Sequence, residues 1–365
     1  MREFVKNNAV AVIAAICAVT TCFFVPPDME YINYFDFKTL ACLFCTLAVV
    51  CALKRINFFY IMARKIIKFF KNTKMAILAL VYITFLGSML LANDMALLTF
   101  LPLGFMVLST TGKTKYMAVT FILQNIAANL GGMLTPFGNP QNLFLYTRFS
   151  IPTGEFMSIM APPFVLAVIL ITICCLFIKK EQLEIDDIQI ILDPVKTIAY
   201  LILFALSIAI VFRTVPYVVG TAIVVVALFI LDKQSFKDVD WGLLLTFTFF
   251  FVFSGNMARI EAVRNIFSGL LEKSTLLLSA VSCQFISNVP SAILLSQFTD
   301  NYRELLYGVN IGGTGTLIAS LASLITFKEY TRHNKGKTLY YIGLFSAFNF
   351  AFLIILTLCC YMFWC

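Results

Sequence analysis

The chain has 365 residues, of which 61% are hydrophobic and 13% charged, and its formal net charge is +8 at pH 7. Soluble domains have about 45–50% apolar and about 25% charged residues, so the composition excludes a soluble globular domain and predicts a polytopic membrane protein. We interpret the positive charge as that of basic residues at the surface of a lipid bilayer, and we expect no nucleic-acid partner. The 11 cysteines lie mostly in apolar segments, so we interpret them as packing residues rather than metal ligands or a disulfide framework.

Apolar segments that predict membrane-spanning helices recur along the chain. They are expected at about 8–25, 38–53, 157–178, 195–212, 214–231, 241–257 and 340–362. Two further segments, 54–74 and 258–273, mix charged and apolar residues and predict amphipathic helices at the membrane surface.

Two other apolar segments, 116–146 and 303–327, cannot be ordinary spanning helices. The first contains NLGGMLTPFGNPQNL from Asn129, and the second contains NIGGTGTLIASLASL from Asn310, with the Gly-Gly pair and a Thr in register. Glycine and proline weaken a helix, and unpaired backbone at membrane depth is tolerated only where it is buried in protein or lines a watery cavity. We therefore predict two broken helices around a site.

A pair of short apolar arms precedes each broken segment. The arms of the second pair, 274–299, meet at Asn288. A helix needs about 20 residues to cross a membrane, and each arm is shorter, so the pair predicts a re-entrant hairpin. The first pair, 75–109, meets at Asn93-Asp94, and the repeat predicts that it is the matching hairpin.

The basic residues predict the orientation of the chain. With the N-terminus in the cytoplasm, most of the 27 Lys and Arg residues fall on the cytoplasmic side. The two hairpins then open to opposite sides. We predict an all-α protein of the plasma (inner) membrane with two inverted repeats, 1–178 and 195–365, joined by a cytoplasmic linker, 179–194. Inverted repeats with broken helices are typical of secondary transporters.

Asp94 is the acid that this topology leaves at mid-membrane. A carboxylate there costs about 2.5–3.5 kcal/mol on insertion scales, which favours a functional role over simple helix capping. The two hairpin tips begin helices whose free N–H groups suit an anion. We expect the site to bind a small anionic substrate through Asn93, Thr135, Asn139, Asn142, Ser287, Asn288, Thr316 and Ser320. Carbonyls near Gly132 and Gly313, together with Asp94, are expected to hold Na⁺ or H⁺ as coupling ion, with no other cofactor.

These segments resemble the ion transporter superfamily that includes divalent anion–sodium symporters, citrate carriers, arsenite permeases and one type of sodium–proton antiporter. The resemblance covers almost the whole chain and rests on Asn93 to Thr99, Gly131 to Leu143, Ser287 to Pro290 and Asn310 to Leu324. It implies a scaffold part, a mobile transport part with elevator-type movement, and a homodimer. The tips depart from the Ser-Asn-Thr of the dicarboxylate branch, and an Asn-Asp tip is more similar to the arsenite permease and antiporter branches.

The leading hypothesis is a secondary active transporter of a small anion or carboxylate, citrate- or dicarboxylate-like, coupled to Na⁺ or H⁺. The alternative is a Na⁺/H⁺ antiporter, in which Asp94 binds the transported ion itself, or an arsenite-type efflux permease. An intramembrane protease is disfavoured because an aspartyl protease needs two membrane aspartates and the sequence has no HExxH pattern. The opposed hairpins disfavour an open channel.

The inverted topology can be tested by labelling. Cysteines introduced at Lys113 and at Asn301, in an otherwise Cys-free variant, should react with a membrane-impermeant reagent from opposite sides of the membrane. Reaction of both from the same side would refute the inverted repeat.

Overall fold

The computed structural model describes residues 9–183 and 192–364, and all regular elements in these two ranges are helices. By length and composition, eight of the described helices could cross a membrane, or nine if one bent pair counts as a single span. This confirms the all-helical, multi-pass prediction. Residues 184–191 of the predicted linker lie outside the described residues.

The elements follow the expected segments closely. The first part of the chain contains α2 (Ala9–Cys22), η1 (Met29–Tyr34), α3 (Phe37–Arg55), α4 (Phe58–Ile67), α5 (Thr73–Leu91) and α6 (Asn93–Thr110). The next part contains η2 (Thr114–Tyr116), α7 (Met117–Gly131), η3 (Gly132–Leu134), α8 (Pro140–Arg148) and α9 (Thr153–Leu176). The remainder contains α10 (Pro194–Val211), α11 (Tyr217–Asp232), η4 (Lys233–Lys237), α12 (Trp241–Arg259), α13 (Glu261–Lys273), α14 (Thr275–Ile286), α15 (Asn288–Leu295), α16 (Tyr302–Ile311), α17 (Leu321–His333) and α18 (Thr338–Phe363).

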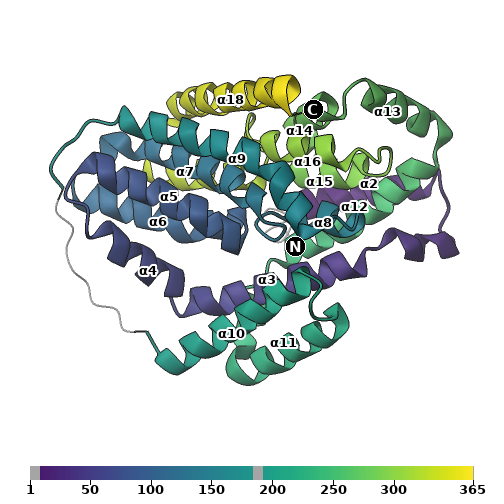
Figure 1. Ribbon diagram of the computed structural model, residues 1–365, viewed down its shortest axis with the longest axis horizontal. Coiled ribbons are helices and arrows are strands. Elements are labelled where there is room, and N and C mark those ends of the chain that lie inside the picture. The colour runs from purple at the N-terminus through teal and green to yellow at the C-terminus, as the bar shows by residue number, and fades with distance from the viewer. Residues whose placement is uncertain (1–8, 184–191, 365) are drawn as a thin grey trace.

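Figure 1 shows how these helices are grouped. Helices α5, α6 and α7 run side by side, and α17 packs against both α6 and α7. Helices α10 and α11 pack on α3 along one edge of the molecule, and α18 lies along the opposite edge. Helix α12 packs mainly on α2, and α15 contacts both α12 and α8. The broken segments are therefore enclosed by helices from both halves of the chain.

Small residues allow the central helices to approach closely, as is common between membrane helices. A Cβ atom at Gly131 of α7 would collide with the Phe85 carbonyl oxygen of α5. One at Gly308 of α16 would collide with Ser279 Oγ of α14 and lie 2.7 Å from the Leu276 carbonyl oxygen. The helix before each break is thus in close contact with the helix before a tip: α7 with α5, and α16 with α14.

Two expectations about helix length need correction. The arms around Asn93 were expected to be short, but α5 has 19 residues and α6 has 18, each long enough to cross a membrane. The segment 54–74 was expected to be one amphipathic helix. Instead α3 continues through Arg55, and α4 starts after Asn57, whose left-handed backbone (φ 58°) turns the chain. An asparagine tolerates this conformation better than a bulky residue.

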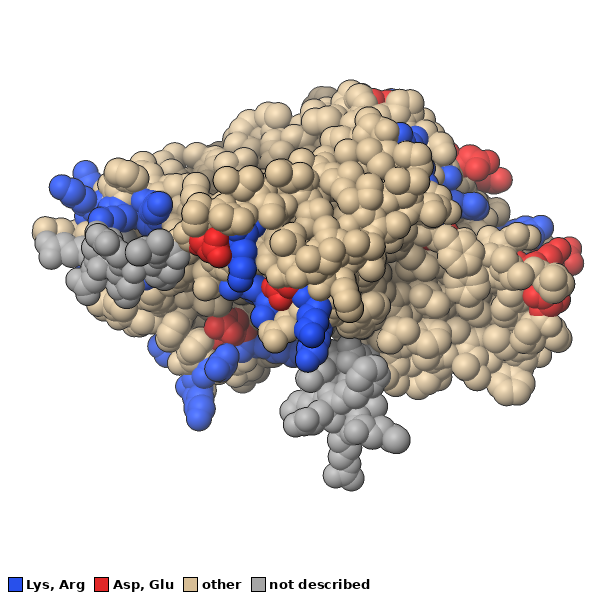
Figure 2. Space-filling view, turned by 90° about the horizontal axis from the view of Figure 1, so that it is seen from below, with Lys and Arg blue, Asp and Glu red and all other residues tan. Residues whose placement is uncertain are grey.

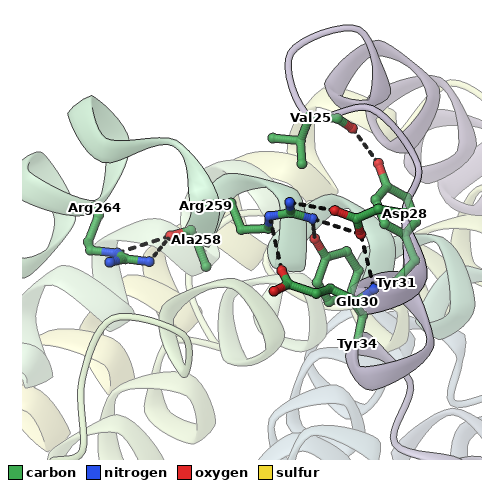
Figure 3. Close-up of polar contacts among 8 residues, drawn as sticks. All are labelled: Val25, Asp28, Glu30, Tyr31, Tyr34, Ala258, Arg259 and Arg264. Atoms are coloured by element: carbon green, nitrogen blue, oxygen red, sulfur yellow. Dashed lines mark hydrogen bonds and ion pairs between the residues drawn. The ribbon is translucent and has the colours of Figure 1, made fainter.

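At one end of the molecule an arginine ties the segment between α2 and α3 to α12 (Figure 3). Arg259 donates hydrogen bonds to both carboxylate oxygens of Asp28, at 2.6 and 3.1 Å, and to the Tyr34 hydroxyl at 3.0 Å. Its Nε also lies 3.4 Å from Glu30. The hydrogen bond from Arg259 lowers the pKa of Asp28 below its usual value. Figure 2 shows a different face, where most of the visible Lys and Arg side chains gather over one half.

The start of the predicted linker is attached to the α6–α7 turn. Glu181 accepts hydrogen bonds from Lys113 Nζ at 2.8 Å and the Tyr116 hydroxyl at 2.6 Å, and pairs with Lys115 Nζ at 2.6 Å. These contacts lower the pKa of Glu181 from 4.5 to about 2, and the hydrogen bond from Lys113 has the largest effect. Thr73, at the start of α5, donates to the Lys179 carbonyl oxygen, so three segments meet at this point.

This attachment predicts a pH dependence. Because the folded pKa of Glu181 is depressed, its stabilising contribution is present above pH 4.5 and is lost as the pH falls from 4.5 towards about 2. Thermal unfolding of the purified protein between about pH 6 and about pH 3 should therefore show a smaller loss of stability in Glu181→Gln than in wild type. The control is Glu261→Gln, an exposed residue of α13 with no ion pair among the described residues. An equal acid response in all three proteins would contradict the role of Glu181.

Candidate functional site

The two tips have the same unusual backbone. Ala92, between α5 and α6, has φ 66° and ψ 150°, and Ser287, between α14 and α15, has φ 73° and ψ 159°. This region is almost restricted to glycine and costs about 1–3 kcal/mol for other residues, which persists only where the surroundings hold it in place. Asn93 and Asn288 follow directly, and the Oδ1 of each accepts the next backbone N–H at 2.9 Å.

The two breaks also correspond. Helix α7 ends at Gly131 and α8 begins at Pro140, whereas α16 ends at Ile311 and α17 begins at Leu321. Thr135 Oγ1 donates to the Met89 carbonyl oxygen of α5 at 2.8 Å, and Thr316 Oγ1 donates to the Gln284 carbonyl oxygen of α14 at 3.0 Å. Each break is thus fastened by its threonine to the helix that leads into a tip.

Both tips and both breaks meet in one buried cluster of amides. Asn93 Nδ2 donates to Asn129 Oδ1 at 3.1 Å, which joins the first tip to the first break. A Cβ atom at Gly313 would lie 3.1 Å from Asn288 Nδ2, 3.2 Å from the Asn310 carbonyl oxygen and 3.6 Å from Asn129 Oδ1. Gly313 therefore lies where the second tip, the second break and Asn129 come together. Asn129 and Asn310 are 2% and 1% exposed, so the cluster lies deep inside the protein.

The first break contributes more amides to this cluster. Asn139 Nδ2 donates to the Asn129 carbonyl oxygen at 3.1 Å and to Asn310 Oδ1 at 3.4 Å. Gln141 Nε2 donates to the same Asn310 Oδ1 at 3.3 Å, and Asn310 Nδ2 donates to Asn142 Oδ1 at 2.6 Å. The two breaks are therefore linked through Asn310, which is matched to Asn129 in the sequence.

Several predicted site residues hold the backbone of the breaks. Asn142 Nδ2 lies within hydrogen-bond distance of the carbonyl oxygens of Gly132 and Met133, both at 3.2 Å, and of Thr135 at 3.4 Å. Ser320 caps α17 by accepting the Ser323 N–H at 3.2 Å. Ser287 Oγ lies 3.3 Å from the Ala319 carbonyl oxygen, which also accepts the Asn288 N–H. These polar groups form the frame of the site, and several are already hydrogen-bonded to protein.

The glycine of the first break is required by space rather than by its backbone angles. Gly132 has φ −64° and ψ −11°, which any residue adopts. A Cβ atom there would collide with Asn139 Oδ1 and lie 2.7 Å from the Gly138 carbonyl oxygen. Asn139 Oδ1 and Gln141 Oε1 are buried and have no hydrogen-bond partner. Two oxygens, Asn139 Oδ1 and the Gly138 carbonyl oxygen, therefore lie close to Gly132, and the first of them has no hydrogen-bond partner.

Asp94 lines a cavity of about 980 Å³. Its Oδ1 is buried without a hydrogen-bond partner, and none of the described Lys or Arg residues forms an ion pair with Asp94. The cavity is lined by Leu47, Cys51, Lys54, Arg55, Asn57, Ala92, Asp94, Met95, Leu98, Pro140, Asp238, Asp240, Leu243 and Ile325. Arg55 is paired with Asp232 at 2.9 Å and with Asp238 at 2.8 Å. The cavity therefore reaches from this charged group to the first tip and the start of α8.

Sequence reasoning missed part of this environment. Lys54 and Arg55 were assigned to the amphipathic helix expected at 54–74, yet they end α3 and share a cavity with Asp94. Gln141 and Gln284 were not singled out, although both bond to the breaks. For Gln284, an uncharged amide in an apolar segment was the available signal, because a buried amide needs a partner. For Gln141, the signal was its place between Asn139 and Asn142 in the first break.

The fold and site define a polytopic membrane protein with a buried polar site built between broken helices. The family model described as "Citrate transporter" matches residues 1–301, and the chain belongs to this family. It is therefore a membrane transporter rather than an enzyme, which confirms the resemblance inferred from the paired segments.

Individual relatives agree with this assignment. The chain is 36% identical over 303 residues to an uncharacterized transporter of Methanocaldococcus jannaschii, covering 82% of this chain and 83% of that protein. It is 29% identical over 322 residues to the inner membrane protein YbiR of Escherichia coli, covering 84% and 83%. A 46 kDa membrane protein of Mycobacterium leprae is 21% identical over 324 residues, covering 73% and 75%.

The space around Gly132 generates a prediction. Gly132→Val should abolish transport and lower stability by about 1–3 kcal/mol or more, because the added atoms meet the Gly138 backbone as well as a side chain. Gly313→Val should have the milder effect, since no neighbouring atom lies closer than 3.1 Å to its added Cβ. Gly343→Val in α18 is the control, because no atom lies within 4 Å of its added Cβ. Transport in vesicles and thermal unfolding would be measured, and normal transport by Gly132→Val would contradict a role for the close approach.

Proposed function

We propose that this protein is a secondary active transporter that moves a small anion or carboxylate, citrate- or dicarboxylate-like, and couples its movement to Na⁺ or H⁺. The observation that carries the proposal is the meeting of two strained tips, each of which opens a helix, with two helix breaks in one buried cluster of amides. A cluster of uncharged hydrogen-bonding groups at membrane depth can bind a polar substrate without a permanent charge of its own.

The proposed architecture is a pair of inverted repeats, residues 1–178 and 195–365, around the linker 179–194. Hydrogen bonds support it as well as sequence. Asn93 and Asn288 cap the next residue in the same way, and the threonine of each break bonds to the carbonyl four positions before its tip asparagine. Helices α14 and α15 have 12 and 8 residues, which supports a re-entrant hairpin at 274–299. By the repeat, α5 and α6 form its partner at 75–109.

The substrate would lie against the N-terminal ends of α6 and α15. The partial positive charge of the helix dipole at each start favours an anion such as a carboxylate. The first N–H groups of α15 already bond to protein, so the direct donors there would be side chains. In this proposal Asn93, Ser287 and Asn288 contact the substrate. The broken backbone around the substrate is held by side chains that already bond to it or to neighbouring helices. These side chains are Asn142, Thr135, Thr316 and Ser320.

The coupling ion would be held in the first half. Asn139 Oδ1 and the Gly138 carbonyl oxygen converge on Gly132, and an unpartnered buried oxygen is a suitable ligand for Na⁺. Asp94 adds an unpaired carboxylate on the nearby cavity wall, beside Pro140. It would either take part in Na⁺ binding or carry the coupled proton.

The cavity beside Asp94 supports an inward-facing state in this proposal. Lys54, Arg55, Asp238 and Asp240 lie at the ends of α3 and α12 that the basic residues assign to the cytoplasm. The scaffold would contain α2, α3 and α10 to α12, and the mobile part would contain α5 to α8 and α14 to α17, moving as an elevator within a homodimer. The inner membrane is the proposed location, in line with the name of the Escherichia coli relative.

The alternative function is a Na⁺/H⁺ antiporter or an arsenite-type efflux permease. Asp94 is the observation that favours it. Of the three carboxylates in the cavity, Asp238 is paired with Arg55 and Asp240 caps α12, whereas Asp94 keeps a buried oxygen without a partner that could bind a cation. In the antiporter, Asp94 would bind the transported cation itself.

Asp94→Asn tests the coupling. The substitution keeps the shape of the side chain and removes its charge, so gradient-driven uptake of labelled citrate or succinate into proteoliposomes should fall about tenfold or more, a change of ~1.4 kcal/mol. The remaining uptake should no longer respond to Na⁺ or pH gradients.

Asp240→Asn is the matched control, because Asp240 lines the same cavity but caps α12 by accepting the Leu243 N–H at 2.9 Å. Unchanged ion dependence in Asp94→Asn would contradict the proposed role of Asp94. Na⁺-driven proton movement by the wild type, without uptake of either carboxylate, would favour the alternative function.

A further inference from the structure

The two breaks differ in the side chain that closes them. In the first break, the amide of Asn142 comes from α8, within the same broken segment. In the second break, the amide of Gln284 comes from α14, the helix that leads into the second tip. The matched position in the first half, four residues before the tip asparagine, is Met89, whose thioether has no N–H to donate.

Gln284 is bonded to the second break at every side-chain polar atom. Its Nε2 lies 2.9 Å from the Gly312 carbonyl oxygen, 3.1 Å from that of Thr314 and 3.0 Å from that of Ala280. Its Oε1 accepts the Thr316 N–H at 2.9 Å. Gly315 has φ +115°, and a Cβ atom there would collide with Gln284 Oε1. The break is therefore shaped around this one side chain.

Of the two breaks, the first is the one with unpartnered side-chain oxygens. Asn139 stands at the start of α8 but makes no side-chain capping bond, and its Oδ1 and Gln141 Oε1 are buried without partners. Ser320 occupies the same register in the second break, and there it caps α17 and shares a 2.9 Å hydrogen bond with Ser323. Among the described residues, no side-chain oxygen of the second break is buried without a partner.

We propose that each protomer holds a single Na⁺, in the first break, and that the amide of Gln284 takes the place of a second cation in the second break. An amide NH₂ group presents partial positive charge to several carbonyl oxygens, as a small cation does, but it is covalently attached and cannot leave. This inference rests on the proposed Na⁺-coupled function and adds its stoichiometry. In both breaks an amide bonds carbonyl oxygens, that of Asn142 in the first and that of Gln284 in the second. Only the first break also keeps buried side-chain oxygens without partners, so only the first has oxygens left for Na⁺.

The number of sites can be counted from stability. A ligand that binds only the native protein raises the free energy of unfolding in proportion to the logarithm of its concentration once its sites are saturated, with a slope proportional to the number of sites. Thermal unfolding of the full-length protein in detergent would be measured over a series of NaCl concentrations, with choline chloride keeping the ionic strength constant. The wild type should show the slope of one site.

Gln284→Glu tests the role of the amide. The carboxylate keeps an oxygen that accepts the Thr316 N–H but places a second oxygen among three carbonyl oxygens. Without Na⁺ this variant should be less stable than the wild type, because a buried carboxylate faces unpaired carbonyl oxygens. Na⁺ should restore its stability with a slope about twice that of the wild type, the signature of a second site.

Two further variants separate this effect from simple damage. Gln284→Met introduces the residue of the matched position, and it should lose stability while its Na⁺ response stays that of the wild type. Gln124→Glu makes the same chemical change at another buried amide, which donates to one hydroxyl, Thr84 Oγ1, and one carbonyl oxygen, that of Phe100. It should lose stability without a steeper Na⁺ response.

The outcomes distinguish the inference from the function on which it rests. A wild-type slope of two sites would overturn the single-site inference and leave Na⁺ coupling intact. A wild type without any stabilisation by Na⁺ would contradict the Na⁺ site of the first break and the Na⁺-coupled function together. A Gln284→Glu slope equal to that of the wild type would overturn the substitution of the amide for a cation. The wild-type slope decides the number of sites even if a variant does not fold.

Discussion

The structure depends on one constraint, which is that backbone polar groups inside a bilayer need partners within the protein. An unbroken helix meets it automatically, but the two breaks free several carbonyl oxygens at once. Asn142 supplies the donor for the first break and Gln284 for the second, while Thr135 and Thr316 fasten the breaks to α5 and α14. The polar residues of this apolar chain are concentrated where the helical hydrogen-bond pattern stops.

The tips follow from the same constraint. Where one residue separates two helices, the last carbonyl oxygens of the first helix and the first N–H groups of the second need partners in a short stretch of chain. Asn93 and Asn288 satisfy one N–H each, and the Asn288 N–H bonds to Ala319. The strained backbone at Ala92 and Ser287 is therefore held by contacts on both sides. Strain maintained in this way keeps the starts of α6 and α15 directed at the buried amides, which is the arrangement a binding site requires.

Charge is distributed differently from amide groups. The described ion pairs lie at the ends of helices, as with Arg259 and Asp28 at one end of α12, and Glu181 with Lys113 and Lys115 beside the α6–α7 turn. Asp94 is the exception, because its carboxylate borders a cavity and has an unpartnered oxygen. The energetic cost of such a group explains why the site is otherwise built from neutral amides and hydroxyls.

The sequence by itself determined the class of the protein, the position of most helices and the location of both breaks. These features depend on local composition: apolar length predicts a span, and Gly131, Gly132, Pro136 and Pro140 stop a helix wherever it lies. It did not determine the length of α5 and α6, because the ends of an apolar helix near Asn93 depend on packing against α7.

The tertiary structure alone decided which amide bonds to which group. Asn139 and Asn142 are alike in sequence context, yet one keeps a free oxygen and the other holds the break. It also brought Lys54 to the cavity of Asp94 and Gln284 into the second break. The physical reason is that an amide accepts and donates equally well, so its partner depends on distant segments that only the folded chain brings together.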